Sequence, residues 1–257
     1  MTKRGKDPKV HQSRRPTILR SNANGVYAFL CRISWRLPEG ERLEGKRILD
    51  CGAAGALPPL AVFAEQGMDC VGIDISEPRL EQSRAFASKR DLPIEFLQGD
   101  MRSLPFDDES FDYVYEDNSI FHLGHSDTTQ AISEMCRVLR PGGLAQFEVV
   151  SRDSWPRSPF GEERARGEFW MVIDEEAECH SMFDDDEADA LISFGNLLSK
   201  VQTISTECGD CLSEEDWNKL HLEAPKACSL DEWMAAYPRR MELIRYIVWR
   251  FLVEKPG

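Results

Sequence analysis

The sequence predicts an α/β protein with a doubly wound, mostly parallel sheet and helices on both faces. Over residues 45–150, short apolar runs that end on acidic residues alternate with segments of helical periodicity, the pattern of a parallel sheet. Ile48 and Leu49 form such a run, which ends on Asp50 and passes into small residues. Pro58 and Pro59 follow and fit the first turn of a helix, so a strand, a tight turn and a helix start come in succession.

The other elements of the core follow in order. Apolar residues at near-helical spacing predict one or two amphipathic helices in residues 21–45. Strands are predicted at 70–73, 94–97, 111–115 and 144–150, with helices after the N-cap candidate Ser76 and at 128–139, where Ser126 and Asp127 are N-cap candidates. Residues 140–143, R-P-G-G, predict a turn. Strands expected at 200–205 and 246–253 bring the sheet to seven strands.

Past residue 150 the pattern is less regular. Residues 151–195 are expected to be an insertion with a short strand at 169–171, and the acids at 184–187 to begin a helix that continues into the apolar stretch 190–198. A metal site at these acids is the alternative. Helical pieces are expected at 214–220 and 230–237. The predicted organisation is a flexible basic arm, 1–20, and a single domain, 21–257, with its core at 45–150, the insertion at about 151–195 and sheet completion at 196–257.

Charge and cysteine content limit the possible partners. The chain of 257 residues has a net charge of −14, and residues 1–20 hold seven basic residues against one acid. The remainder has 24 basic and 44 acidic residues, which argues against binding a large nucleic acid. Eight scattered cysteines predict reduced thiols, and no apolar run has the length of a membrane span or signal. We therefore expect a cytoplasmic protein, monomeric or homodimeric, with no membrane partner.

Asp74 is the most informative side chain after the turn at 52–55. An acid that ends the second strand, about 20 residues beyond a glycine-bearing turn, can accept both hydroxyls of a ribose. A dinucleotide fingerprint is not present, because Ala54 and Leu57 occupy the positions of its second and third glycines. The turn therefore predicts a nucleoside-containing cofactor bound at the carboxyl ends of the strands.

Five motifs in order carry a family resemblance: I-L-D-C-G-A-A-G at 48–55, G-I-D-I-S at 72–76, G-D-M at 99–101, F-D-Y-V-Y at 111–115 and L-R-P-G-G-L at 139–144. With these motifs, residues 45–150 resemble the class I S-adenosylmethionine-dependent methyltransferases of the small-molecule type. The resemblance implies a Rossmann-like fold with an antiparallel last strand, S-adenosylmethionine as cofactor, and direct displacement at the sulfonium methyl group.

The resemblance also implies the cofactor contacts. Asp50 and Gly52 would lie beside the methionine part of the cofactor, with Ala53 lining the turn and the Glu116 carbonyl accepting from the ammonium group. Asp74 would bind the ribose, Ile75 would pack on adenine, Asp100 would accept from the adenine amino group, and the Met101 backbone would meet the ring. Tyr27 is added as a further cofactor contact or as part of the acceptor lining. Ala54 replaces the usual second glycine. Alanine is tolerated there if its φ is negative, so we expect altered contact and not lost binding.

The acceptor side is less defined by the sequence. His122, shortly after the fourth strand, is the candidate base or acceptor-orienting group, and packing is the alternative. Asn118, Trp170, His180 and Phe183 are the candidate acceptor-binding residues. His122 and His125 lack a third ligand, so no metal site is predicted. Cys208 and Cys211 form a lone C-x-x-C, for which a turn is favoured over a zinc or redox site.

These observations lead to one main hypothesis and two alternatives. The main hypothesis is transfer of a methyl group from S-adenosylmethionine to a small molecule. A protein that binds the cofactor without turnover, as a sensor or partner, is the first alternative, because Ala54 alters the turn and no base is assured. Methylation of a protein or a transfer RNA is the second, and the basic arm is its only support.

Overall fold

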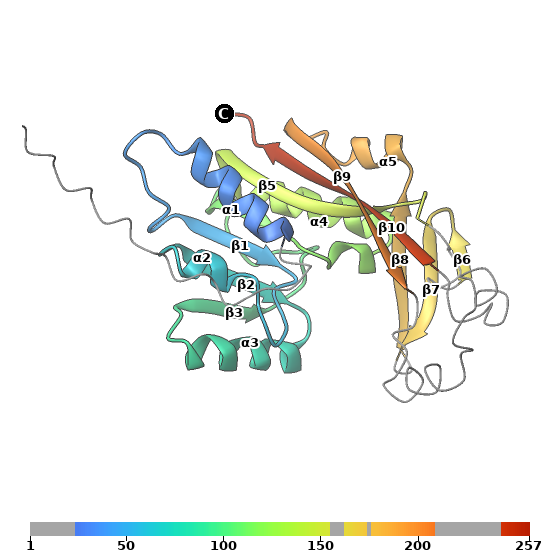
Figure 1. Cartoon of the computed structure of the whole chain (residues 1–257), viewed down its shortest axis with the longest axis horizontal. Coiled ribbons are helices and arrows are strands. Elements are labelled where there is room, and N and C mark those ends of the chain that lie inside the picture. The colour runs from blue at the N-terminus through green and yellow to red at the C-terminus, as the bar shows by residue number, and fades with distance from the viewer. Residues whose placement is uncertain (1–23, 155–161, 174–175, 209–242) are drawn as a thin grey trace, which may run out of the picture.

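A ten-stranded sheet forms the centre of the structure, a computed structural model that describes residues 24–154, 162–173, 176–208 and 243–257 (Figure 1). The strands are β1 Arg47–Cys51, β2 Asp69–Asp74, β3 Ile94–Gln98, β4 Phe111–Tyr115, β5 Leu139–Ser151, β6 Glu162–Ala165, β7 Glu168–Ile173, β8 Glu176–Phe183, β9 Asn196–Cys208 and β10 Leu243–Glu254. The helices are α1 Asn24–Arg36, α2 Ala61–Ala64, α3 Glu77–Lys89, the 3₁₀ turn η2 Ile120–His122, α4 His125–Val138 and α5 Asp185–Ala190.

Seven of the strands make the predicted doubly wound sheet, in the order β3-β2-β1-β4-β5-β10-β9. The pairs from β3 to β5 are parallel, and β10 is antiparallel to both β5 and β9. The predicted α/β fold, mostly parallel with an antiparallel last strand, is confirmed. The strand order reverses between β1 and β4, the point at which such sheets open a crevice for ligands.

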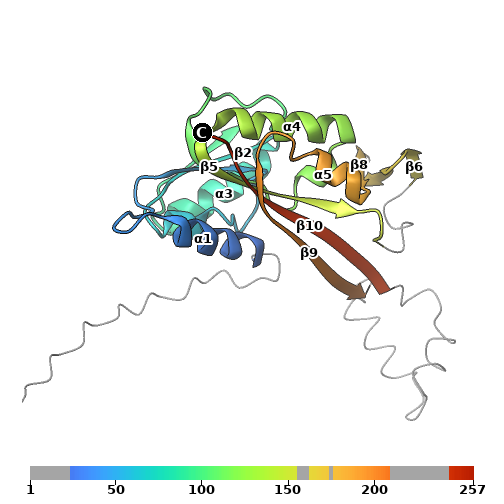
Figure 2. The same ribbon diagram turned by 90° about the horizontal axis from the view of Figure 1, so that it is seen from above.

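Helices cover both faces of this sheet (Figure 2). The first three pack one apolar cluster, in which Phe29 of α1, Phe63 of α2 and Leu80 of α3 are buried. On the opposite face α4 and α5 pack a second cluster, with Met135 and Ala188 buried against β5 and β10. The helices cover both apolar faces of the sheet, so the ends of the strands are left uncovered.

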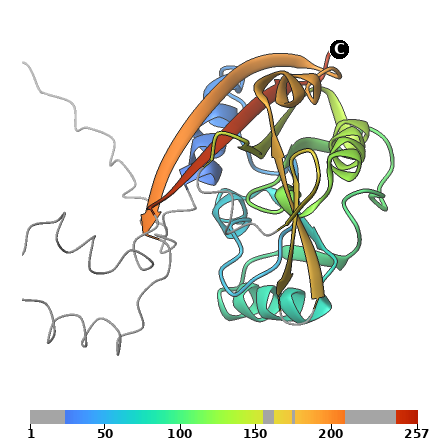
Figure 3. The ribbon, with the colours of Figure 1, turned by 90° about the vertical axis from the view of Figure 1, so that its right-hand side faces the viewer.

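The insertion after β5 adds three strands that the sequence did not reveal in full. β6, β7 and β8 form an antiparallel meander, and the predicted short strand at 169–171 lies within β7. β8 joins β5 in parallel at Val150–Met182 and Ser151–Phe183. Figure 1 shows the arrows of β1 and β3 pointing toward the side on which β7 and β8 lie, and these two strands face the viewer in Figure 3. The insertion thus stands beside the carboxyl ends of the core strands.

Three local predictions were wrong in their boundaries. α4 begins at His125 with Gly124 as N-cap, so Ser126 and Asp127 lie in its first turn. Residues 140–143 form no separate turn but a bulge inside β5, where the β4 register shifts. The acidic helix, α5, carries a capping box of Asp184 and Glu187 and ends at Ala190. The apolar stretch that follows enters β9, because pairing with β10 outweighs its local helical pattern.

Some predictions fall outside the described residues: the arm 1–20, the helical pieces at 214–220 and 230–237, and the loop after Cys208 that contains Cys211. The five cysteines with described side chains, Cys31, Cys51, Cys70, Cys136 and Cys179, are free thiols. No helix in the described part of the chain is long and apolar enough to cross a membrane.

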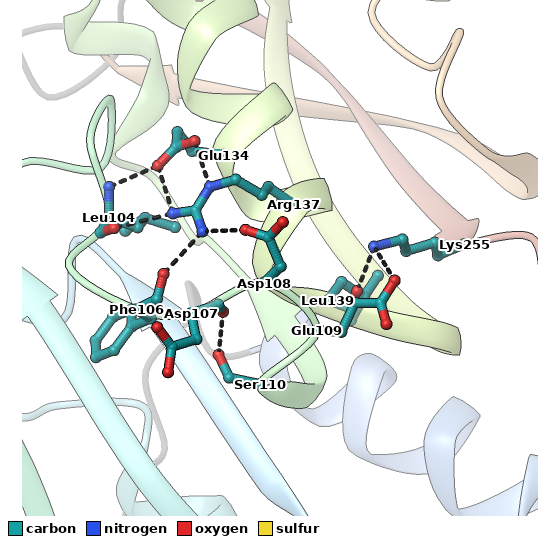
Figure 4. A network of polar contacts seen from close by, with 10 residues as sticks. All are labelled: Leu104, Phe106, Asp107, Asp108, Glu109, Ser110, Glu134, Arg137, Leu139 and Lys255. Carbon is teal, nitrogen blue, oxygen red and sulfur yellow. Dashed lines mark hydrogen bonds and ion pairs between the residues drawn. The ribbon is translucent and has the colours of Figure 1, made fainter.

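Arg137 of α4 fixes the loop between β3 and β4 (Figure 4). Its guanidinium donates to the carbonyls of Leu104 and Phe106 at 2.9 and 2.8 Å, and to the carboxylates of Glu134 and Asp108. Glu134 in turn accepts from the Leu104 N–H at 2.9 Å. Because this loop follows the carboxyl end of β3, the network sets the position of the residues just after that strand.

Candidate functional site: a crevice at the carboxyl ends of the strands

The turn after β1 lies at the carboxyl ends of the core strands, and Gly52 is its tightest point. The N–H groups of Gly52 and Ala53 both donate to the Ile73 carbonyl, at 2.8 and 3.1 Å, which ties the turn to β2. Gly52 has a φ of +97°, and a Cβ there would lie 2.3 Å from the Ser119 Cβ and 3.6 Å from the Met101 Cε. Only glycine fits this position, which brings the ends of β1, β3 and β4 into contact.

Asp74 holds the second half of the turn. Its carboxylate accepts the N–H groups of Ala54 at 3.2 Å and of Ser76 at 2.9 Å, one on each oxygen. Ala54 is not among the residues with positive φ, which meets the condition for alanine in place of glycine. The next residue, Ile75, exposes 70% of its side chain, so an apolar surface lies beside a half-buried carboxylate.

Ser83 and Arg79 of α3 support the turn, and neither was predicted from the sequence. Ser83 is fully buried, donates toward the carbonyls of Ala53 and Gly55, and accepts the Gly55 N–H at 2.9 Å. The Arg79 guanidinium donates to the Ala54 carbonyl at 3.3 Å. A signal existed for Ser83, because it lies three residues after Leu80 and four before Ala87 on the buried face of α3.

Asp100 and Met101 follow β3 on the next side of the crevice. Both oxygens of Asp100 accept from the Arg102 guanidinium, which lowers the pKa of this carboxyl, and Arg102 also pairs with Asp127 at 2.5 Å. The carboxylate is therefore held in a fixed orientation. The backbone N–H of Arg102 also donates to Asp100 Oδ1 at 2.8 Å, so this one residue makes two donor contacts to each carboxylate oxygen.

Buried acids gather where β1 and β4 end. Asp50 is 2% exposed and accepts the Tyr115 hydroxyl at 2.6 Å; burial, with Asp117 and Asp74 nearby, raises its pKa to about 8. Burial and Glu148 raise the pKa of Glu116 to about 8 and that of Asp117 to about 7. Desolvation disfavours negative charge here, and a positively charged ligand would favour the ionised form of these carboxyls.

The Glu116 side chain has a structural role that the sequence did not show. Its carboxylate accepts the N–H groups of Ser119 and Ile120, both at 3.1 Å, and of Glu148 at 2.5 Å. This arrangement closes the turn from β4 into η2 and places Asn118 at a positive φ of 62° on the exposed rim. The Ser119 side chain of this turn contacts the Gly52 loop, where its hydroxyl donates to the Gly52 carbonyl at 3.3 Å.

Comparisons with known proteins agree with this geometry. Residues 49–147 match the family model described as a methyltransferase domain. The chain is 34% identical over 113 residues to a sterol 24-C-methyltransferase from Pneumocystis carinii, covering 42% of this chain and 29% of that protein. It is 28% identical over 151 residues to a malonyl-[acyl-carrier protein] O-methyltransferase from Salmonella typhimurium, covering 59% of this chain and 55% of that protein.

A solved structure agrees with the fold. It is the crystal structure of the 1,6-didemethyltoxoflavin-N1-methyltransferase of Burkholderia thailandensis with 1,6-didemethyltoxoflavin and S-adenosylhomocysteine bound. The TM-score is 0.56 at 15% sequence identity, and the match covers 92% of this chain and 79% of that chain. Residues 49–147 therefore form a methyltransferase domain of the class I S-adenosylmethionine-dependent type. The matches span about a third to a half of the length of the curated relatives compared above.

The residues at the carboxyl ends of β1, β2 and β4 fit S-adenosylmethionine, a cofactor with sulfonium and ammonium charges. Asp50 is buried and Asp117 half-buried, so a positively charged group would favour ionisation of both, and Asp74 beside exposed Ile75 pairs a bidentate acceptor with an apolar surface. These are the features that a methionine moiety, a ribose and an adenine ring require. Bound there, the cofactor supplies an electrophilic methyl group.

The structure separates the residues predicted for the acceptor side. His122 of η2 is 5.0 Å from His180 of β8, measured between ring centroids, and its Nδ1 lies 3.5 Å from a Glu178 oxygen. Burial is the main cause that lowers the pKa of His122; the Glu178 charge opposes this shift and the Arg79 charge adds to it. His125 lies apart, with Nε2 at 2.9 Å from the Met182 carbonyl.

The other predicted acceptor residues lie away from His122. Trp170 pairs with Cys179 on β8, whereas Phe169 pairs with His180, so alternation places Trp170 and His180 on opposite faces. Phe183 is 3% exposed and stacks on His125 in the core. Tyr27 of α1 is half-buried against the cluster under β1, and burial raises the pKa of its hydroxyl.

A pocket of about 320 Å³ lies at the opposite, amino-terminal edge of the sheet, between the end of α1 and the β5 bulge. Its basic residues are already paired within it: Arg36 with Glu254 at 2.9 Å, Lys46 with Glu41 at 3.0 Å and Arg140 with Asp112 at 3.0 Å. These pairs leave no focused charge for a ligand. The candidate functional site is at the other edge.

Proposed function

We propose that this protein transfers the methyl group of S-adenosylmethionine to a small-molecule acceptor. The observation that carries the proposal is the Asp74 carboxylate beside exposed Ile75 at the end of β2, because a ribose and an adenine ring require an acceptor next to an apolar surface. The methyltransferase domain supports the same reaction. A cytoplasmic location and a monomeric or homodimeric state stay predictions.

The reaction needs few protein groups. An acceptor nucleophile forms a bond to the methyl carbon, the carbon–sulfur bond breaks, and its electron pair stays on sulfur as the positive charge is lost. The residues of this chain contribute binding, alignment and exclusion of water. Gly52, Asp74 and Asp100 would hold the donor, while His122 would orient the acceptor or take its proton.

A small acceptor is supported by position and charge. β8 and η2 stand at the carboxyl edge and leave His122 partly exposed, with 44% of its side chain accessible. The acidic chain repels phosphate backbones. The names of the similar proteins describe methylation of a sterol and of malonyl-[acyl-carrier protein], a small-molecule and a carrier-bound acceptor.

Calorimetry with S-adenosylhomocysteine tests cofactor binding. The wild-type chain should bind one equivalent, and Asp74→Asn should weaken binding by about 10- to 100-fold, because a carboxylate that accepts two hydroxyls is lost. Asp69→Asn is the matched control, since Asp69 is an exposed acid at the other end of the same strand. Absence of binding by the folded wild-type chain would refute the proposal.

Transfer is tested separately with methyl-labelled donor and fractions of small metabolites, protein and transfer RNA. Label in a small-molecule product supports the proposal. Binding of S-adenosylhomocysteine without labelled product in any fraction indicates a protein that binds the cofactor without turnover. Label in the protein or transfer RNA fraction would show that the acceptor is a macromolecule and not a small molecule.

A further inference from the structure

Three metal-ligating side chains meet at the acceptor side of the crevice. His122 of η2, Glu178 and His180 of β8 each offer one ligand atom, and these atoms lie within 4.8 Å of one another. Within the ranges that the structure describes, no other such group of three is found. The sequence pairs His122 with His125, but the fold turns His125 toward Met182 and brings two residues of the insertion to His122 instead.

The backbone explains why these residues converge. Glu178 and His180 are two apart on a strand, so their side chains leave the same face of β8. Phe121 supports the group from beneath, because its ring lies 4.0 Å from that of His122 and 5.4 Å from that of His180. Phe121 itself packs on the buried cluster of Val150, Phe169 and Met182. The ligands are therefore mounted on packed elements and not on a free loop.

Stability does not account for this arrangement. The His122 and Glu178 side chains are 44% and 37% exposed, with 3.5 Å between Nδ1 and Oε2. A pair so exposed contributes only about 0–1 kcal/mol to folding. The two imidazole rings also lie only 5.0 Å apart between centroids, beside that carboxylate. A cation between them would turn all three side chains into favourable partners.

The ligand set selects the type of ion. Two imidazoles and one carboxylate suit borderline divalent transition metals such as Zn²⁺, Fe²⁺ or Ni²⁺, whereas Mg²⁺ and Ca²⁺ prefer oxygen ligands alone. Three protein ligands leave at least one coordination position open, as in catalytic zinc sites. Ligand atoms in such a site lie about 3 Å apart, so small side-chain rotations from the present spacing suffice.

We propose that His122, Glu178 and His180 bind one divalent transition-metal ion whose open position faces the crevice. His180 is buried, Glu178 half-buried and His122 exposed, so the group is closed toward the core and open on the His122 side. This side continues through η2 to Ser119, which touches the Gly52 turn. Resting on the proposed function, the ion would hold an oxygen or nitrogen donor of the acceptor and orient it toward the methyl group.

Metal binding by the full-length chain tests this site. After chelator treatment and dialysis, the protein is titrated with Co²⁺ and with Zn²⁺, using the visible d–d absorption of Co²⁺ and its displacement by Zn²⁺. One equivalent should bind. Glu178→Gln, His122→Asn and His180→Asn should each lower affinity by about 100-fold or more, since even outer partners of ligands contribute 10- to 100-fold.

Matched variants separate this site from other donors. His125→Asn changes a neighbouring histidine outside the group and should bind one equivalent as wild type does. Cys208→Ser with Cys211→Ser removes the C-x-x-C thiols and should likewise have no effect, with no thiolate charge-transfer band in the wild-type Co²⁺ spectrum. Glu178→Gln changes a half-exposed side chain and keeps the test decisive if His180→Asn fails to fold.

The outcomes are distinct from those of the proposed function. Three results would overturn the metal site. They are Co²⁺ binding that is unchanged in folded Glu178→Gln, Co²⁺ binding that is lost when the two cysteines are replaced, and no binding of one equivalent by the wild-type chain. S-adenosylhomocysteine affinity should be unchanged in Glu178→Gln, because this residue lies outside the donor half of the crevice. A wild-type chain that binds metal but no S-adenosylhomocysteine would refute methyl transfer and leave the metal site standing.

Discussion

Replacing Asp50 by asparagine should make the stability of the protein less dependent on pH. The Asp50 carboxyl is buried against Tyr115 and stays protonated until its pKa of about 8, whereas an aspartate of the unfolded chain ionises near pH ~4. Between these values the folded state binds the extra proton, so the free energy of unfolding falls as pH rises. The loss is about 1.4 kcal/mol per pH unit for one such group.

From about pH 5 to about pH 7 this one carboxyl therefore costs the wild-type chain roughly 3 kcal/mol, as an upper estimate. Asparagine keeps the shape and an acceptor for the Tyr115 hydroxyl but does not ionise. Glu116 and Asp117 remain in both proteins, so the difference between the two pH profiles isolates Asp50.

Urea unfolding at several pH values, followed by tryptophan fluorescence, measures this difference. The stability of Asp50→Asn relative to wild type should rise steadily from about pH 5 to about pH 7. Asp69→Asn, which alters an exposed acid at the start of β2, is the control. Parallel profiles for wild type and Asp50→Asn would show that Asp50 is not held protonated and would refute the argument.

Three further changes test the crevice and its support. Gly52→Ala places a residue with a Cβ in the left-handed region and against Ser119. It should lower the free energy of unfolding in urea by at least about 1–2 kcal/mol and abolish S-adenosylhomocysteine binding. Adding Ser119→Gly to the same chain should restore part of the stability. Ser83→Ala removes the hydroxyl that links both ends of the turn, so thermal unfolding should show a loss of about 1–3 kcal/mol, and an unchanged melting temperature would contradict that role. Arg137→Ala releases the carbonyls of the β3–β4 loop and should cost about 2 kcal/mol while weakening S-adenosylhomocysteine binding less than Asp74→Asn does; a larger effect on binding than on stability would contradict a purely supporting role.

The cofactor half of the crevice was largely predictable, because its signals are local. A strand that ends on Asp50, a turn with Gly52 and a second strand that ends on Asp74 lie within 25 residues, and parallel strands bring such ends to one edge. Ala54 was expected to be compatible with the turn, and it is not among the residues with positive φ.

The acceptor half was not predictable in the same way. His180 and Glu178 are more than 50 residues from His122, and their proximity depends on two residue pairs between β5 and β8. Nothing in the charged segment around them specifies that register. The same reason explains why Trp170 and His180, expected together, lie on opposite faces of the β7–β8 ribbon.

The sequence by itself therefore determined the α/β class, the order of the core elements and the turn that faces the cofactor, since periodicity and turn chemistry act over a few residues. The tertiary structure decided what no local pattern contains. It set the β10 and β9 pairing that turned an apolar stretch into a strand, the burial that keeps Asp50 protonated, and the contact of η2 with β8 that joins His122 to Glu178 and His180. Each depends on residues distant in the chain, whose meeting is fixed by packing of the whole sheet.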